Sequence, residues 1–221
     1  MVTLEIISDP ICPWCYIGKA RLDQAIAETG LDPFEVSWRI FQLNPTMPPE
    51  GMDRQEYLQA KFGGPEGAER VYSHVRRTAA ETGLELKFDA IRRTPNTFDA
   101  HRLIRWAKAG GHQPAVVQQL FQRYFERGED ISDHAILLDA AAAAGMERAV
   151  VAELLAGDAD RETLTEEEEA ARRMGVGGVP CFVIDGRYVL NGAQDVETWK
   201  GVIAKLAEAP AGEAGEAERA P

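Results

Sequence analysis

The chain has 221 residues, of which 45% are hydrophobic, and this suits one domain with a sizeable insertion and a substantial core. Its 24 basic and 36 acidic side chains give a formal net charge of −12. This charge repels phosphate backbones and anionic bilayers, so we expect no nucleic acid and no membrane among the partners.

The N-terminus and the cysteine count predict the compartment. Residues 1–5 lack the basic and apolar regions of a secretory signal, and no apolar run reaches the roughly 20 residues that span a bilayer. Three cysteines are too few for a secreted domain stapled by disulfides. The sequence therefore predicts a cytoplasmic protein.

The first predicted strand, residues 2–7, leads into two cysteines separated by two residues. Cys12, Pro13, Trp14 and Cys15 stand where the strand pattern gives way to a helical pattern over residues 16–29. Unpaired N–H groups and the positive end of the dipole at a helix N-terminus favour a thiolate over a thiol. We therefore expect a redox-active dithiol in which Cys12 is the nucleophile. Cys15, on the inward stripe of the helix, is expected to be more buried and to resolve the mixed disulfide formed at Cys12.

The cysteine pair allows two other interpretations. A structural zinc site needs four ligands, and neither a second cysteine pair nor a closely spaced histidine pair is present, so we expect no metal. An inert pair of core cysteines is disfavoured by the prolines and the tryptophan around the helix start.

A second strand is predicted from Phe34 to Ile40, where apolar and polar residues alternate. Strand, helix and strand make a βαβ unit, whose strands are expected to be parallel. The proline-rich segment from Asn44 to Gly51 then directs the chain out of the sheet.

Residues 52–174 show only helical periodicity, with a loop expected over residues 84–91. Helices are expected to begin near Asp53, Pro65, Thr97, Pro114, Asp133, Glu147 and Thr165. Thr165 and Glu168 have the spacing of a capping box. The glutamates at 166–169 are interpreted as a solvated helix start rather than a metal site, because adjacent helix residues do not face a common point.

Strand character returns at residues 177–184. Asp185 and Gly186 predict a tight hairpin turn, and residues 187–190 its antiparallel mate. Asp195 can cap a final helix. Residues 209–221, almost all Ala, Gly, Glu and Pro, are expected to be a disordered tail.

Three segments carry a family resemblance: Ser8 to Cys15, Asn96 to Leu103, and Gly178 to Ile184. In this order they resemble the DsbA family of thioredoxin-like oxidoreductases, and its FrnE-like branch most closely. The resemblance implies an α/β, thioredoxin-like fold with a large all-helical insertion between the βαβ half and the cis-proline ββα half. The thioredoxin-like domain would comprise residues 1–43 and 176–208, and the inserted domain residues 44–175.

The resemblance also implies roles for residues around the dithiol. The bond between Val179 and Pro180 would be cis, and these two residues would bind the substrate beside Cys12. Pro13 and Trp14 would tune the thiolate.

Two residues invite more than one interpretation. Cys181 departs from the family motif. Strand alternation favours a small buried packing residue, and the alternative is a third thiol near Cys12. His101 is interpreted as a packing histidine, with an approach to the active site as the alternative.

Together these patterns predict a thiol-disulfide oxidoreductase of the reductase or isomerase type, acting on protein or small-molecule thiols and disulfides. No cofactor is expected beyond exchange with glutathione, and a glutathione or thioredoxin system is the expected redox partner. One alternative is a glutathione-dependent isomerase or transferase, similar to the kappa-class transferases and hydroxychromene-carboxylate isomerases. These generally carry serine where Cys12 stands. The other alternative is a non-catalytic, peptide-binding holdase. The sequence leaves open the natural substrate, the direction of electron transfer and the oligomeric state.

Overall fold

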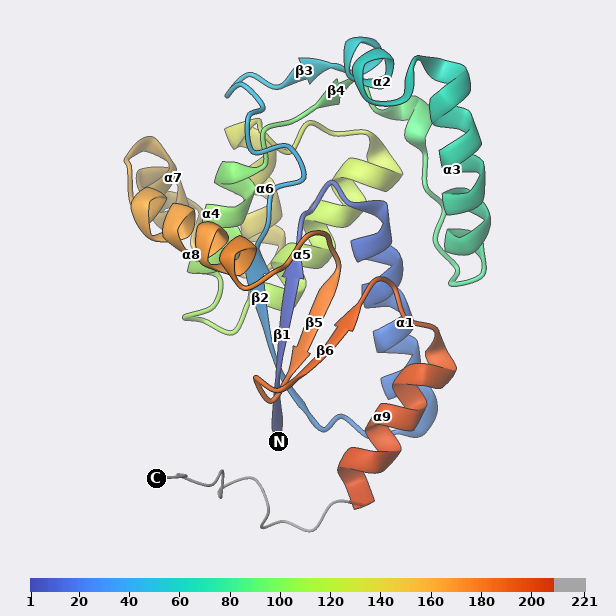
Figure 1. The fold of residues 1–221 in the computed structure, drawn as a ribbon. Coiled ribbons are helices and arrows are strands. Elements are labelled where there is room, and N and C mark those ends of the chain that lie inside the picture. Colours follow the sequence, from blue (N-terminus) through green and yellow to red (C-terminus); the bar gives the residue numbers. More distant parts are fainter. Residues whose placement is uncertain (209–221) are drawn as a thin grey trace.

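A four-stranded sheet organises the computed structural model, which describes residues 1–208 (Figure 1). The tail predicted to be disordered, residues 209–221, lies outside the described residues. The strand order is β2-β1-β5-β6. The strands are β1 (Val2–Ser8), β2 (Phe34–Ile40), β5 (Cys181–Ile184) and β6 (Tyr188–Asn191).

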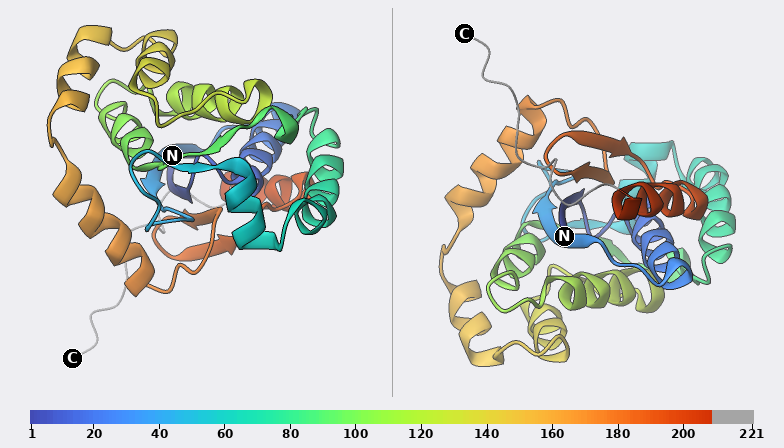
Figure 2. Two further views of the ribbon diagram at one scale, coloured as in Figure 1. Left: turned by 90° about the horizontal axis from the view of Figure 1, so that it is seen from above. Right: turned by 90° about the horizontal axis from the view of Figure 1, so that it is seen from below.

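The first half of the sheet is the predicted βαβ unit. Strands β1 and β2 are parallel, with Val2 opposite Phe34, and helix α1 (Pro13–Thr29) connects them. Strand β5 runs antiparallel to β1, and β6 antiparallel to β5. Helices α1 and α9 (Val196–Glu208) lie side by side against one face of the sheet (Figures 1 and 2). The α/β thioredoxin-like class is thereby confirmed.

The elements between β2 and β5 are mostly helical. The helices are α2 (Arg54–Phe62), α3 (Pro65–Ala80), α4 (Phe98–Trp106), α5 (Gln113–Phe121), α6 (His134–Ala143), α7 (Arg148–Ala156) and α8 (Arg161–Arg173), with a 3₁₀ turn η1 (Phe88–Ala90) and a π-helical turn η2 (Gln122–Glu126). Helical periodicity missed two short strands, β3 (Met52–Asp53) and β4 (Arg93–Thr94), which pair antiparallel. Two residues are too few to show the alternation that identifies a strand.

Most predicted helix starts are confirmed, but the one at Thr165 is wrong. Asp53 accepts hydrogen bonds from two backbone N–H groups of α2, and Asp133 from one of α6. Helix α8 instead begins at Arg161, and the Thr165 hydroxyl donates to the Arg161 carbonyl at 2.9 Å, inside the helix. This back-bonding to residue i−4 is the common alternative for a threonine that does not cap. Glu168 is therefore an interior residue of α8.

The hairpin and the last helix follow their sequence signals. Asp185 and Gly186 have φ angles of 54° and 65°, the positive values that a type I′ turn requires. Asp195 accepts a hydrogen bond from the Thr198 N–H at 2.7 Å at the start of α9.

One hydrophobic core joins the two parts of the chain. Its largest cluster contains Ile6, Phe182 and Trp199 from the thioredoxin-like part together with Leu103 and Phe121 from the inserted helices. The inserted helices thus bury their apolar faces against the sheet and α1. The division into two domains at residues 43/44 and 175/176 stays a prediction about the organisation of the chain.

No helix among residues 1–208 combines the length and apolar character that crossing a membrane requires.

Candidate active site

The dithiol stands at the N-terminus of α1. Cys12 is the N-cap residue, with extended backbone angles of φ −89° and ψ 112°, and Pro13 occupies the first helical turn. Proline suits this place because its missing N–H would have no intrahelical partner and its fixed φ is already helical. The Cys12 carbonyl accepts hydrogen bonds from the N–H groups of Cys15 at 3.0 Å and Tyr16 at 3.3 Å. The local sequence therefore places the two thiols on one turn.

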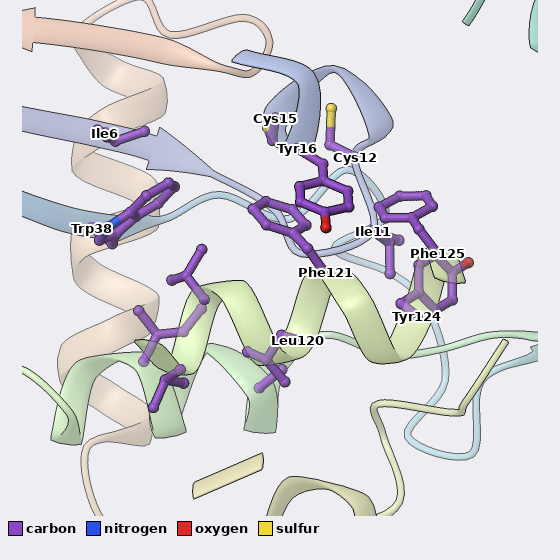
Figure 3. Packing of buried hydrophobic residues seen from close by; sticks show 14 of the residues in the cluster. Ile6, Ile11, Cys12, Cys15, Tyr16, Trp38, Leu120, Phe121, Tyr124 and Phe125 are labelled. Carbon is purple, nitrogen blue, oxygen red and sulfur yellow. The ribbon is translucent and has the colours of Figure 1, made fainter. Parts of the chain in front are cut away.

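The expected difference in burial between the two cysteines is not found. Cys12 is 2% exposed and Cys15 1% exposed, because both pack into the core beside Tyr16 and the aromatic residues of α5 and η2 (Figure 3). The cysteines differ instead in access. Cys12 lines a cavity of about 250 Å³, whereas Cys15 is not among its lining residues. A molecule in this cavity meets the sulfur of Cys12 first.

The two thiols have different electrostatic surroundings. Burial raises the pKa of the Cys15 thiol well above its usual value, and its hydrogen bond with Cys12 raises it further. The Ser8 side chain and the Asp9 backbone oppose this shift of the Cys15 pKa only in part. The Cys12 thiol donates to the Val179 carbonyl at 3.5 Å. The raised pKa thus keeps the Cys15 thiol protonated, and it is Cys12, not Cys15, that lines the cavity.

The loop before β5 closes the other side of the dithiol. The peptide bond between Val179 and Pro180 is cis, and Val179 lines the cavity with Cys12. Helix α1 approaches this loop closely at Gly18, where an added Cβ would lie 3.2 Å from both Pro180 and Phe182. Only glycine fits there without displacing its neighbours. The structure therefore brings Cys12, Pro13, Trp14 and Val179 around one space.

A buried acid and a buried base lie beneath the loop that carries Cys12. Burial raises the pKa of Asp9 to about 7, although its carboxyl accepts from the N–H groups of Leu43 at 2.7 Å and Ile11 at 3.2 Å. Burial lowers the pKa of His101 to about 3, opposed by a hydrogen bond with the backbone of Phe41. The Nε2 atom of His101 lies 3.9 Å from the Asp9 Oδ1 and has no hydrogen-bond partner within residues 1–208.

This pair settles the position of His101 and adds a residue that sequence reasoning missed. His101 is buried next to Asp9 and is not among the residues that line the cavity with Cys12. In the sequence, Asp9 stands out only as part of the segment Ser8 to Cys15 that carries the family resemblance. A usable signal existed: an acidic residue directly after an apolar strand and three positions before the first cysteine.

Comparison with known proteins identifies the family. A family model described as "DSBA-like thioredoxin domain" matches residues 3–204. The chain belongs to this family. The uncharacterized protein YwbO of Bacillus subtilis is 27% identical over 206 residues, which cover 91% of this chain and 96% of YwbO.

Solved structures agree with this assignment. The crystal structure of a probable DsbA oxidoreductase, SCO1869 of Streptomyces coelicolor, matches with a TM-score of 0.82 and 31% identity, over 94% of this chain and 90% of that chain. The cytosolic disulfide reductase DsbM of Pseudomonas aeruginosa, solved with GSH, matches with a TM-score of 0.66 and 20% identity, over 94% and 100% of the two chains. At that identity the likeness to DsbM shows the fold alone. The predicted DsbA family is confirmed, and the FrnE-like branch stays a prediction.

The third cysteine of this DsbA-like domain packs away from the cavity. Cys181 is 1% exposed in a small cluster with Ile7 and Phe41, and burial raises the pKa of its thiol. This arrangement fits the packing interpretation. Across residues 1–208, no three His, Cys, Asp or Glu side chains come together as a candidate metal site.

The far wall of the cavity comes from the inserted part of the DsbA-like domain and was not foreseen. Helices α2 and α3 supply Arg54, Tyr57, Lys61 and Tyr72 to it, and η2 adds aromatic residues. In Figure 1, α2 lies at the end of the sheet where α1 begins, and α3 runs beside α1. Helical periodicity in α2 could not show that Arg54 lines the same cavity as Cys12.

Proposed function

We propose that this protein is a thiol-disulfide oxidoreductase that works through Cys12 and Cys15. The observation that carries the proposal is the arrangement of the two thiols: Cys12 lines the cavity, and Cys15 lies behind it, one helical turn away, with its pKa raised by burial. A nucleophile must be accessible. A resolving thiol must be close but should not react first.

The reaction has two balanced steps. In the first, the Cys12 thiolate attacks one sulfur of a substrate disulfide, forms a mixed disulfide and releases one substrate thiolate. In the second, Cys15 loses its proton to water and attacks the Cys12 sulfur, which breaks the mixed disulfide, forms the Cys12–Cys15 disulfide and releases the second thiolate. Each released thiolate takes up a proton from water and becomes a thiol. Two electrons pass from the protein dithiol to the substrate. Two molecules of an external thiol, or one external dithiol, reverse both steps at the protein, restore the dithiol and leave as a disulfide.

The neighbouring residues take positioning roles in this proposal. Pro13 and Trp14 shape the turn that holds the Cys12 sulfur at the cavity, and Trp14 packs on His74 of α3 with ring centroids 5.5 Å apart. Val179 offers its backbone beside that sulfur for the substrate, and Pro180, whose carbonyl accepts from the Gly192 N–H at 2.8 Å, follows it through the cis peptide bond. The DsbM structure with GSH makes glutathione a sensible first thiol to test, within the expected glutathione or thioredoxin system.

The test is equilibration of the purified protein with graded ratios of reduced to oxidised glutathione, followed by tryptophan fluorescence and thiol counting. We expect one reversible transition of two thiols. It should be absent in Cys12→Ser, and Cys15→Ser should stop at a mixed disulfide with glutathione. Cys181→Ser is the matched control, because Cys181 is equally buried but does not line the cavity. A transition that survives in Cys12→Ser, or none in the wild type, would contradict the proposal.

The same variants address the two alternatives. An isomerase or transferase of the glutathione-dependent type should keep its turnover in Cys15→Ser, since its chemistry needs one site for the glutathione sulfur and no resolving thiol. A holdase should keep protecting a client from aggregation when both active-site cysteines are serine. No feature of the described residues favours either alternative over the dithiol.

A further inference from the structure

The cavity beside Cys12 is positively charged, although the protein as a whole is acidic. Its lining residues include Arg54 and Lys61 and no aspartate or glutamate. The whole chain carries a formal charge of −12. The charged residues that line this cavity are thus all cations, although the molecule has an excess of carboxylates. An anion that the rest of the surface repels would be attracted here.

Arg54 is a buried cation without an anionic partner in the described part of the chain. It is 6% exposed. Its guanidinium donates to two neutral groups, the Thr94 hydroxyl at 3.0 Å and the Tyr72 hydroxyl at 2.7 Å, and its Nε atom has no hydrogen-bond partner within residues 1–208. The rings of Tyr57 and Tyr72 lie 5.4 and 5.5 Å from its central carbon. Burying a charge without a counterion is costly, so this site is built to receive a negative group.

Lys61 provides a second cation at the rim. It lies seven residues after Arg54 on α2, which is about two helical turns, so both side chains project from one face of the helix. Lys61 is exposed, and its ammonium donates to the Tyr57 hydroxyl at 2.6 Å. An anion would thus pass Lys61 before it reaches Arg54.

We propose that this cavity binds the carboxylate of a small, acidic thiol or disulfide, with Arg54 as the anchor and the substrate sulfur at Cys12. This inference rests on the proposed function and specifies its substrate class. The aromatic wall, Tyr57, Tyr72 and Phe125 among others, packs against the carbon chain between sulfur and carboxylate. A volume of about 250 Å³ is below the usual range of drug-sized pockets, which suits one short arm of such a molecule. Electron flow is as above: the disulfide gains two electrons and leaves as two thiols.

The test compares three disulfides whose arms each contain two methylene groups and differ in the end group: anionic 3,3′-dithiodipropionate, neutral 2-hydroxyethyl disulfide and cationic cystamine. Each is mixed with the fully reduced protein in a single turnover, and each rate is divided by the rate with free dithiothreitol to remove intrinsic reactivity. We expect the anion to exceed the neutral compound by roughly tenfold or more, as a charge-assisted hydrogen bond in a buried site implies, and the cation to be slowest.

Variants assign the preference to residues. Arg54→Gln should reduce the ratio of anionic to neutral rates to near that of the free thiol, whatever its effect on the absolute rate with the neutral disulfide. Lys61→Gln should reduce it less, and mainly at low salt, because its charge is exposed. Arg70→Gln removes an equal charge from an exposed residue of α3 that does not line the cavity, and should leave the ratio unchanged.

A second measurement keeps the inference testable if Arg54→Gln fails to fold. Octanedioate has the shape of dithiodipropionate but no disulfide, and it should protect wild-type Cys12 from iodoacetamide, whereas 1,8-octanediol should not. Equal rates for the three disulfides, or no protection by octanedioate, would overturn the inference and leave the oxidoreductase intact. Failure of the neutral disulfide as well would instead overturn the proposed function.

Discussion

The loop that carries Cys12 has two contrasting surroundings. On the cavity side, the inserted helix α2 presents the cations Arg54 and Lys61. On the buried side, beneath the loop, Asp9 and Glu168 are carboxyl groups enclosed by protein, and His101 is a base whose pKa is lowered by burial. The same insertion supplies residues to both. In the proposed function, the cavity side selects the substrate, and the buried side holds the backbone from which the Cys12 sulfur projects.

The largest effect should come from the reacting sulfur itself. Cys12→Ser is expected to reduce disulfide reduction to the uncatalysed rate for every substrate, whatever its charge, because no other thiol lines the cavity. Arg54→Gln should instead lower the ratio of anionic to neutral rates and keep a catalysed reaction with both substrates. Single-turnover rates with the neutral and anionic disulfides check this contrast. If Cys12→Ser still reduced the anionic disulfide, Cys12 would not be the residue that reacts, and the proposed separation between reaction at Cys12 and anion binding at Arg54 would be wrong.

The next effect concerns the buried side and depends on pH. Asp9 is expected to titrate near 3.8 when unfolded and at about 7 when folded, so its contribution to stability is present below about pH 4 and is lost as pH rises toward 7. Relative to the wild type, Asp9→Asn should gain roughly 3 kcal/mol in free energy of unfolding between about pH 5 and pH 8. Urea denaturation of both proteins at the two pH values measures this difference.

His101 supplies the opposing control. Its pKa is lowered from 6.5 to about 3, so its contribution is present above about pH 6.5 and is lost as pH falls toward 3. His101→Gln should therefore flatten the acid limb of the stability curve, the limb that Asp9→Asn leaves in place. Identical pH profiles for the wild type and Asp9→Asn would show that Asp9 is not held protonated by burial.

The features that the sequence could predict are local, and those that it could not predict join distant parts of the chain. The Cys12–Cys15 pair, the cap at Asp53 and the hairpin at Asp185 are local, and each depends on residues within a few positions of one another. The charged cavity and the buried pair are not local. Arg54 and Cys12 line the same cavity although 42 positions separate them in the sequence, and Asp9 lies beside His101, which is 92 positions away. Periodicity identifies which residues share a helix face but not what that face meets, so neither arrangement could be inferred.

The error at Thr165 has a related cause. A Thr-x-x-Glu spacing caps a helix only when the threonine backbone is outside it, and the spacing itself is equally compatible with the interior of a helix. Helix α8 begins at Arg161, directly after Asp160, whose backbone is in the left-handed conformation. A hydrophobic pattern does not predict such a conformation. The spacing therefore predicts a solvated Glu168, whereas this residue is only 7% exposed.

A smaller effect should follow from crowding the contact between α1 and the cis-proline loop. Gly18→Val places carbon atoms against Pro180 and Phe182, and such overpacking costs roughly 1–3 kcal/mol in free energy of unfolding. Gly201→Val is the matched control, because a Cβ at Gly201 in α9 meets nothing within 4 Å. Thermal or urea unfolding of the two variants gives the comparison. Equal losses would mean that helix propensity, and not the approach of Pro180, sets the cost.

The smallest expected effect tests whether charge on the buried side reaches Asp9. The Glu168 carboxylate accepts from the Gln42 N–H at 2.8 Å and from Arg172 at 2.7 Å, and its negative charge contributes to the raised pKa of Asp9. Glu168→Gln keeps an acceptor for the Gln42 N–H but removes that charge, so the pKa of Asp9 should fall toward its ordinary value while remaining raised by burial. Carboxyl chemical shifts followed by NMR across the titration would show the lower midpoint. Glu169→Gln, one residue along α8 and exposed, changes the net charge equally and should leave the Asp9 midpoint in place. A shift of the same size in both variants would mean that Asp9 senses overall charge and not its neighbour on the buried side.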